Sequence, residues 1–184
     1  MFRSLLLALP LLVACTTLPP ADTATLPRDA VTGAGDPTRT AIITTNAVFA
    51  ESRPAAGNPG SAARAIAQME FLAVDLPLNN NFTNASPNLG SQMQAARREW
   101  RGALDIAPEA AAQPVINALY AASRALESGQ RDAAAAALPS TIFRRGGQQT
   151  LAQLSALPNM PSTAVAAATA QQAIPTSRAG AFSL

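Results

Sequence analysis

Carboxylic acids are the only side chains in this sequence from which a catalytic acid and base could be chosen. The 184 residues include no histidine and no lysine, so a serine–histidine triad, a Schiff-base lysine and a P-loop are all excluded. Two carboxylates can still serve as acid and base, as they do in glycoside hydrolysis. The candidates are Glu70 with Asp75, and Glu99, Asp105 and Glu109.

The surroundings of these acids in the chain favour solvated side chains rather than catalytic ones. Asp105 comes four residues after Arg101, which is the spacing of a surface ion pair on a helix. Glu70 differs from the others because apolar Met69 and Phe71 flank it. Isolated acids on helix faces are mostly solvated, and we expect the same of Glu70. We therefore predict no catalytic residue and no enzymatic activity.

Three arginines form a candidate anion-binding site. Arg97, Arg98 and Arg101 lie within five residues, and guanidinium groups bind phosphate or carboxylate through paired hydrogen bonds. The alternative, which we favour, is a solvated helix face whose aliphatic stems cover the edge of the core. Arg144 and Arg145 precede two glycines; they could bind an anion in a turn, or could simply keep a loop soluble.

The composition also argues against metals and cofactors. Without histidine, a zinc site would have to be built from carboxylates alone, which is unusual, and haem would lack its common axial ligand. Glycine-rich dinucleotide fingerprints are missing from the sequence. The formal net charge of +2 is too small to indicate nucleic acid as a partner. We predict neither metal nor cofactor.

The single cysteine follows an apolar N-terminal run. Arg3 precedes the apolar residues 5–11, and the motif Leu12-Val13-Ala14-Cys15 comes next. A positive start, an apolar centre and a small-residue cleavage site are the layout of a secretory signal. With cysteine at its end, the motif resembles the lipobox of bacterial lipoproteins.

This resemblance implies a lipid-anchored protein of the bacterial cell envelope. In that family a diacylglycerol is attached to the sulfur, here that of Cys15, and the signal is cut, here between Ala14 and Cys15. Several acyl chains hold a protein firmly at a membrane, whereas a single chain gives only marginal binding. The resemblance also implies the periplasmic face of the outer membrane rather than the inner membrane, because Thr16 stands where an aspartate retains such proteins at the inner membrane.

Two other interpretations of the N-terminus remain open. The first is an ordinary cleaved secretory signal with an unmodified cysteine. The second is a single transmembrane helix, although the apolar run is shorter than the roughly 20 residues that span a bilayer.

Apolar periodicity predicts an all-α fold, a small alanine-rich bundle of about five to seven helices after a flexible tether. The clearest stripe comprises Leu89, Met93, Ala96 and Trp100, and we expect Trp100 in the core. The helix of this stripe and the next one are the expected core pair. The expected helices cover residues 36–53, 61–76, 86–105, 108–129, 130–138, 151–157 and 162–174, with an asparagine-rich loop at 79–88.

The resulting division of the chain is a signal peptide at 1–14, a lipidated N-terminus and disordered tether at 15–36, a helical domain at 37–174 and a flexible tail at 175–184. We predict a non-catalytic envelope module that binds or scaffolds an envelope-protein or cell-wall partner. One alternative is a carrier of a small ligand or lipid, with a cavity lined by Phe71, Trp100 and Leu119. The other is a carboxylate-dependent hydrolase of wall glycans.

Overall fold

The computed structural model of this chain describes residues 22–30, 35–50, 57–83 and 86–174. The predicted signal peptide, Cys15 with its cleavage site, and the predicted tail at 175–184 lie outside these residues. None of the helices in the described ranges combines the length and the hydropathy needed to span a bilayer.

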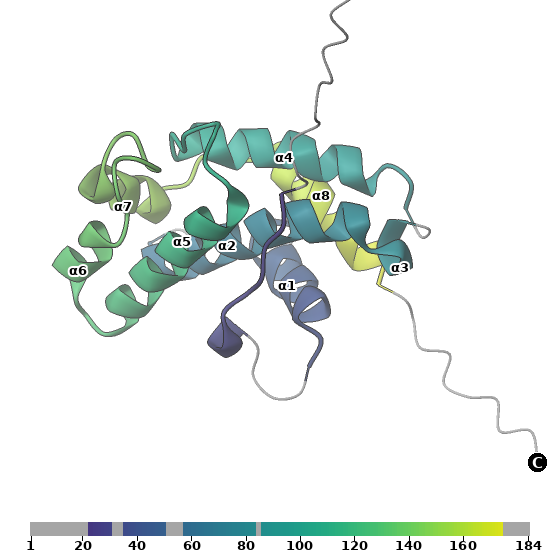
Figure 1. Ribbon diagram of the computed structural model, residues 1–184, viewed down its shortest axis with the longest axis horizontal. Helices are drawn as coiled ribbons and strands as arrows, with labels where there is room; N and C mark the ends of the chain where they lie inside the picture. Colours follow the sequence, from purple (N-terminus) through teal and green to yellow (C-terminus); the bar gives the residue numbers. More distant parts are fainter. Residues whose placement is uncertain (1–21, 31–34, 51–56, 84–85, 175–184) are drawn as a thin grey trace, which may run out of the picture.

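The all-α prediction is confirmed, because the described residues form eight α-helices and no strand (Figure 1). The one β-type contact there is a single bridge between Ile106 and Phe143. The helices are α1 (Pro37–Thr45), α2 (Pro59–Asp75), α3 (Asn80–Thr83), α4 (Leu89–Ala103), α5 (Ala112–Glu127), α6 (Arg131–Ala136), α7 (Gly147–Ser155) and α8 (Pro161–Gln172). Three short elements accompany them: 3₁₀ helices at Arg28–Ala30 and Leu76–Leu78 and a π-helix at Asn46–Ala50.

Local capping chemistry explains where the helices begin. Asp36 accepts a hydrogen bond from the Thr38 amide at 3.0 Å and caps α1, as its position before a proline predicts. Asn58, and not the expected Ser61, caps α2, because its side chain accepts from the Ser61 amide at 2.9 Å. The loop expected at 79–88 instead contains the single turn α3, which brings the number of helices to eight.

Helix α2 is the centre of the bundle. Thirteen of its 17 residues are buried, as expected of a helix that is apolar around its whole circumference. It packs most extensively on α5 and also contacts α1, α4 and α7. In Figure 1 it lies in the middle of the molecule, below α4.

The expectation that α4 and α5 form the core pair is wrong. Among the described residues, α4 packs mainly on α8 and also on α2, whereas α5 packs mainly on α2 and α6. The reason is that α2 offers apolar residues on several sides and takes the central position. The stripe on α4 is nevertheless buried as predicted, and Trp100 is fully buried.

A close approach of two backbones joins α6 to α7. A Cβ atom on Gly147 would overlap the carbonyl group of Ala135, so α7 can begin there only with glycine. Nearby, the Arg144 amide donates to the carbonyl of Asp105 at 3.0 Å, and the Ala107 amide donates to the carbonyl of Ile142 at 2.8 Å. These two bonds hold the loop before α7 against the end of α4.

Candidate functional site

The most distinctive group of the molecule is the carboxylate of Glu70, which is fully buried on α2. Arg97 donates to its Oε1 from Nε at 2.9 Å and from Nη2 at 2.6 Å. The indole Nε1 of Trp100 donates to Oε2 at 2.9 Å. Arg101 donates to both oxygens, from Nε at 3.3 Å to Oε2 and from Nη2 to Oε1. The expectation that Glu70 is solvated is therefore wrong.

The spacing on α4 explains why these donors converge. Arg97, Trp100 and Arg101 stand at positions i, i+3 and i+4, which share one face of a helix. That face meets the C-terminal half of α2, where Glu70 stands between the apolar residues Met69 and Phe71. A buried charge is tolerated when opposite charges and hydrogen bonds surround it, and the face of α4 supplies both.

Arg97 and Arg101 are consequently not the solvated face that we favoured. Their side chains are only 15% and 11% exposed. Burial acts to lower the pKa of Arg97, but the charge of Glu70 and the hydrogen bonds to Asp22 and Glu70 outweigh it, so the pKa rises above its ordinary value. Arg101 also donates to the carbonyl oxygens of Pro108, at 3.3 Å, and Ala110, at 2.9 Å, and so holds the turn after α4.

The N-terminal segment at 22–30 extends this network across the surface. Asp22 accepts from Nη2 of Arg97 at 2.7 Å, and its two oxygens accept from the backbone amide of Ala112 at 3.2 Å each. Because Ala112 is the first residue of α5, Asp22 satisfies one of the amides left free at a helix N-terminus. The carboxylate thus joins α4 and α5.

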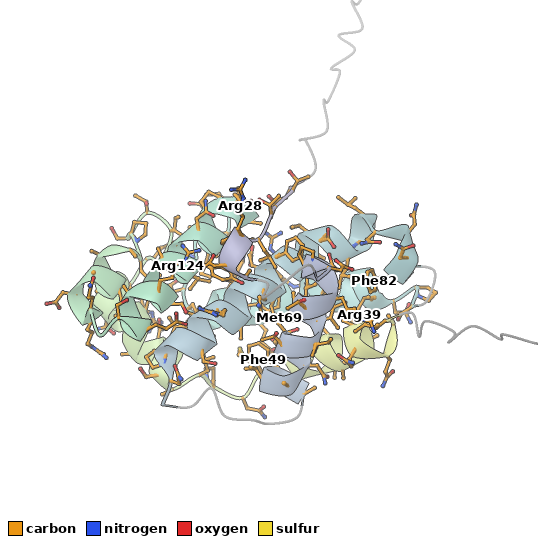
Figure 2. The ribbon with its side chains drawn as sticks, turned by 90° about the horizontal axis from the view of Figure 1, so that it is seen from below. Arg28, Arg39, Phe49, Met69, Phe82 and Arg124 are labelled. Atoms are coloured by element: carbon orange, nitrogen blue, oxygen red, sulfur yellow. The ribbon has the colours of Figure 1, made fainter. Side chains whose placement is uncertain are left out.

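Further along, the same segment is held to α5 by two more contacts. The Thr25 amide donates to the side chain of Gln113 at 2.7 Å. Arg124 donates to Asp29 from Nε at 2.6 Å, and the guanidinium carbon lies 5.8 Å from the centre of the Tyr120 ring. Figure 2 labels Arg28 of this segment and Arg124 of α5. The prediction of a disordered tether up to residue 36 is therefore wrong for residues 22–30.

Above the buried network, the outer side of α4 is hollowed by a surface pocket of about 390 Å³. We call it the arginine pocket, because four of its nine lining residues are arginines. All three predicted anion-binding residues, Arg97, Arg98 and Arg101, line it. The fourth arginine is Arg144, which the loop before α7 brings to the rim. The other lining residues are Gln94, Gly102, Asp105, Ile106 and Pro108.

The charges around the arginine pocket are only partly balanced. Arg98 is exposed and has no ion-pair or hydrogen-bond partner among the described residues. Arg144 and Arg145 approach the carboxylate of Asp105 only at 3.4 and 3.5 Å. Asp105 has a φ of 49°, an uncommon conformation that aspartate tolerates better than most residues. It pairs with these arginines and not with Arg101, contrary to the spacing argument.

The remaining candidate acids have separate structural roles. Both oxygens of Glu99 accept hydrogen bonds at the start of α8, including one from the Thr163 amide at 2.7 Å. Asp75 accepts from the Thr38 hydroxyl at 3.0 Å, and Glu109 is exposed. The structure does not bring the five candidate acids together. The described residues also contain no group of three acids or cysteines that could hold a metal ion.

Comparison with protein-family models, with curated proteins and with solved structures finds no match for this chain. Its function is therefore inferred from the residues and their geometry.

Proposed function

We propose that this chain is a lipid-anchored, non-catalytic binding module of the cell envelope. It is held by acyl groups on Cys15, faces the periplasm from the outer membrane, and presents the surface around α4 to an acidic partner. The lipobox and Thr16 support the anchor and its location. The arginine pocket supports the binding role.

The observation that carries this proposal is that two arginines of α4 are paired with the buried Glu70, while a third arginine of the same helix is exposed. Both oxygens of the buried Glu70 accept hydrogen bonds from Arg97, Trp100 or Arg101. Both oxygens of this acid are thereby occupied, whereas Arg98 on the same helix is exposed and has no partner among the described residues. An exposed positive surface beside an acid whose oxygens are already occupied suits recognition rather than catalysis.

The two alternatives have less support. The carrier would need space between Trp100 and Leu119, but both side chains are fully buried in the core and Phe71 is 5% exposed. The arginine pocket and a smaller hollow that shares Gln94 and Arg97 with it are lined by other side chains. The hydrolase would need two carboxylates in one cleft, and in the arginine pocket Asp105 is the one acid that lines the wall.

The anchor is tested by the intact mass of the membrane-extracted protein, with a Cys15→Ala variant fractionated in parallel. We expect the mass of a mature chain that begins at Cys15 and carries acyl groups. We expect the variant to lose both the modification and its association with the membrane fraction. An unmodified mass in the parent protein would overturn the lipoprotein proposal.

The absence of catalysis is tested by incubating the purified protein with isolated cell-wall glycan. We expect the protein to release no soluble fragments. Release of fragments by the parent protein would contradict the proposal. It would favour the hydrolase if the Asp105→Asn variant lost this release and the Glu109→Gln variant, which lacks an exposed acid, kept it.

A further inference from the structure

We propose that the arginine pocket binds the headgroup phosphate of an anionic phospholipid in the membrane that anchors the protein. The choice of a membrane lipid rests on the proposed anchoring at Cys15. The phosphate-binding chemistry rests on the pocket alone. Three observations support this assignment: unused donors, an adjoining apolar groove and the short chain between the pocket and Cys15.

The first observation is the supply of unused donors in the arginine pocket. Within the described residues, Arg98 has no partner and Nη1 of Arg97 makes no hydrogen bond. Arg144 is 54% exposed and only 3.4 Å from Asp105, so it can rotate towards a stronger acceptor. Planar guanidinium groups match phosphate oxygens in pairs, and a volume of about 390 Å³ lies within the usual range of ligand pockets.

The second observation is an apolar groove that adjoins the arginine pocket. It measures about 180 Å³, and Gln94 and Arg97 line both hollows. The groove wall includes Val74, Pro77 and Leu78, and Leu78 is 61% exposed. A ligand that spans both hollows would need an anionic head joined to an apolar part. A phospholipid fits this description, whereas inorganic phosphate would leave the groove empty.

The third observation is the position of the N-terminal segment. Asp22 lines the apolar groove and binds Arg97. Seven residue steps separate Asp22 from Cys15, and a fully extended chain of that length reaches at most about 25 Å. If Cys15 carries the lipid anchor, the groove and the arginine pocket are therefore kept within reach of the headgroup layer.

The binding test uses the full chain purified in a neutral detergent and three soluble probes. These are dihexanoyl-phosphatidylglycerol, dihexanoyl-phosphatidylcholine and inorganic phosphate. Trp100 is the only tryptophan of the chain, and it shares Glu70 with Arg97 and Arg101. Its fluorescence is therefore expected to report binding in the pocket. We expect saturable binding of the anionic lipid and much weaker binding of the other two probes.

Variants identify the binding residues without disturbing the buried network. We expect Arg98→Gln to weaken binding of the anionic lipid about tenfold, since losing one hydrogen bond to a charged group lowers an affinity by about this factor. Arg144→Gln should have a similar effect. The matched control is Arg39→Gln on α1 (Figure 2), because Arg39 is also exposed and unpaired within the described residues. It should bind like the parent, and the urea midpoints of all three variants should agree.

Other outcomes would overturn either the binding site, the lipid assignment or the anchor, and the test distinguishes these cases. Equal weakening by Arg39→Gln would show binding through general charge, which overturns the site. Inorganic phosphate as strong as the anionic lipid would overturn the lipid assignment. This test does not depend on the modification of Cys15. Lipid binding by an unmodified chain would therefore support the lipid site in the arginine pocket and overturn only the proposed anchor.

Discussion

At the scale of single residues, Glu70 organises the chemistry of this protein. Its buried carboxylate draws Arg97 and Arg101 inward, and Arg97 in turn holds Asp22. One acid thus links α2, α4 and the N-terminal segment. A buried ion pair is weak evidence for stability as such, yet removing one partner is costly because the other charge stays buried.

We expect Glu70→Gln to lower the free energy of unfolding by about 3 kcal/mol, because Arg97 and Arg101 would lose their shared carboxylate. Urea denaturation followed by circular dichroism measures this change. The emission of Trp100 should also shift, since its indole donates to the same acid.

The control for this prediction is Glu127→Gln. Glu127 pairs with Arg64, but its side chain is 55% exposed, and exposed pairs contribute at most about 1 kcal/mol. Equal losses in the two variants would show that burial of Glu70 does not determine its contribution.

At the scale of elements, two helices are capped by acids that come from elsewhere in the chain. The residue before α8, Met160, has no side chain that could cap it, and Glu99 on α4 accepts from the amides of Ser162 and Thr163. Asp22 does the same for the first residue of α5. Such contacts fix the angle between helices as well as satisfying their ends.

We predict that Glu99→Ala lowers the free energy of unfolding by about 1 kcal/mol, the usual cost of a lost N-cap. The effect should concentrate in α8, so amide hydrogen exchange in this helix should accelerate. Glu109→Ala, which removes an exposed acid, is the control and should leave exchange unchanged. Unaltered exchange of α8 in Glu99→Ala would refute the cap.

Gly147 determines the contact between α6 and α7. Gly147→Ala should destabilise the protein by about 2 kcal/mol, because the new methyl group would overlap the carbonyl of Ala135 and force the helices apart. The matched control is Gly102→Ala on α4, where a Cβ meets nothing within 4 Å. That change should stabilise by roughly 0.5–1 kcal/mol, from helix propensity. Urea midpoints that move in the same direction would contradict this account.

At the scale of the whole molecule, the docked segment at 22–30 is the structural link between the helical domain and the proposed anchor. It crosses the surface from Arg97 on α4 to Arg124 on α5, and in Figure 1 it runs across the front of the bundle. If Cys15 carries the proposed anchor, a domain held in this way lies closer to it than one joined by a free chain over the whole of residues 15–36.

The docking of this segment should weaken in acid. Hydrogen bonds from Arg124 hold the pKa of Asp29 below its ordinary value of 3.8, an effect that burial only partly opposes. The stabilising contact is therefore complete above pH 3.8 and is lost as the pH falls through the lowered pKa. We expect the NMR signal of the Thr25 amide, which donates to Gln113, to report this release in a titration from pH 7 to about pH 2.

The Asp29→Asn variant is the control for that titration, since it removes the titrating carboxyl group. It should show weaker docking already at neutral pH and no transition from this residue. A transition of the Thr25 signal at the same pH in both proteins would assign the release to another group.

How much of this structure was predictable depends on the range of the interactions involved. Apolar spacing over a few turns predicted the all-α fold and the buried stripe that ends at Trp100, because a helix repeats every 3.6 residues. The same reasoning identified Arg97, Arg98 and Arg101 as candidates. It did not predict that Arg144 joins them, since the loop contact that places it spans 39 residues of sequence.

The sequence by itself therefore determined the fold class, most helix positions, the exclusion of histidine and lysine chemistry, and the expectation of a lipid anchor. These follow from composition and from neighbours within a few residues. Only the tertiary structure decided that Glu70 is buried, that Asp22 docks, and that α2 rather than α4 and α5 forms the centre. The physical reason is that each of these depends on partners 27 to 90 residues away, and no local spacing specifies which helix faces will meet.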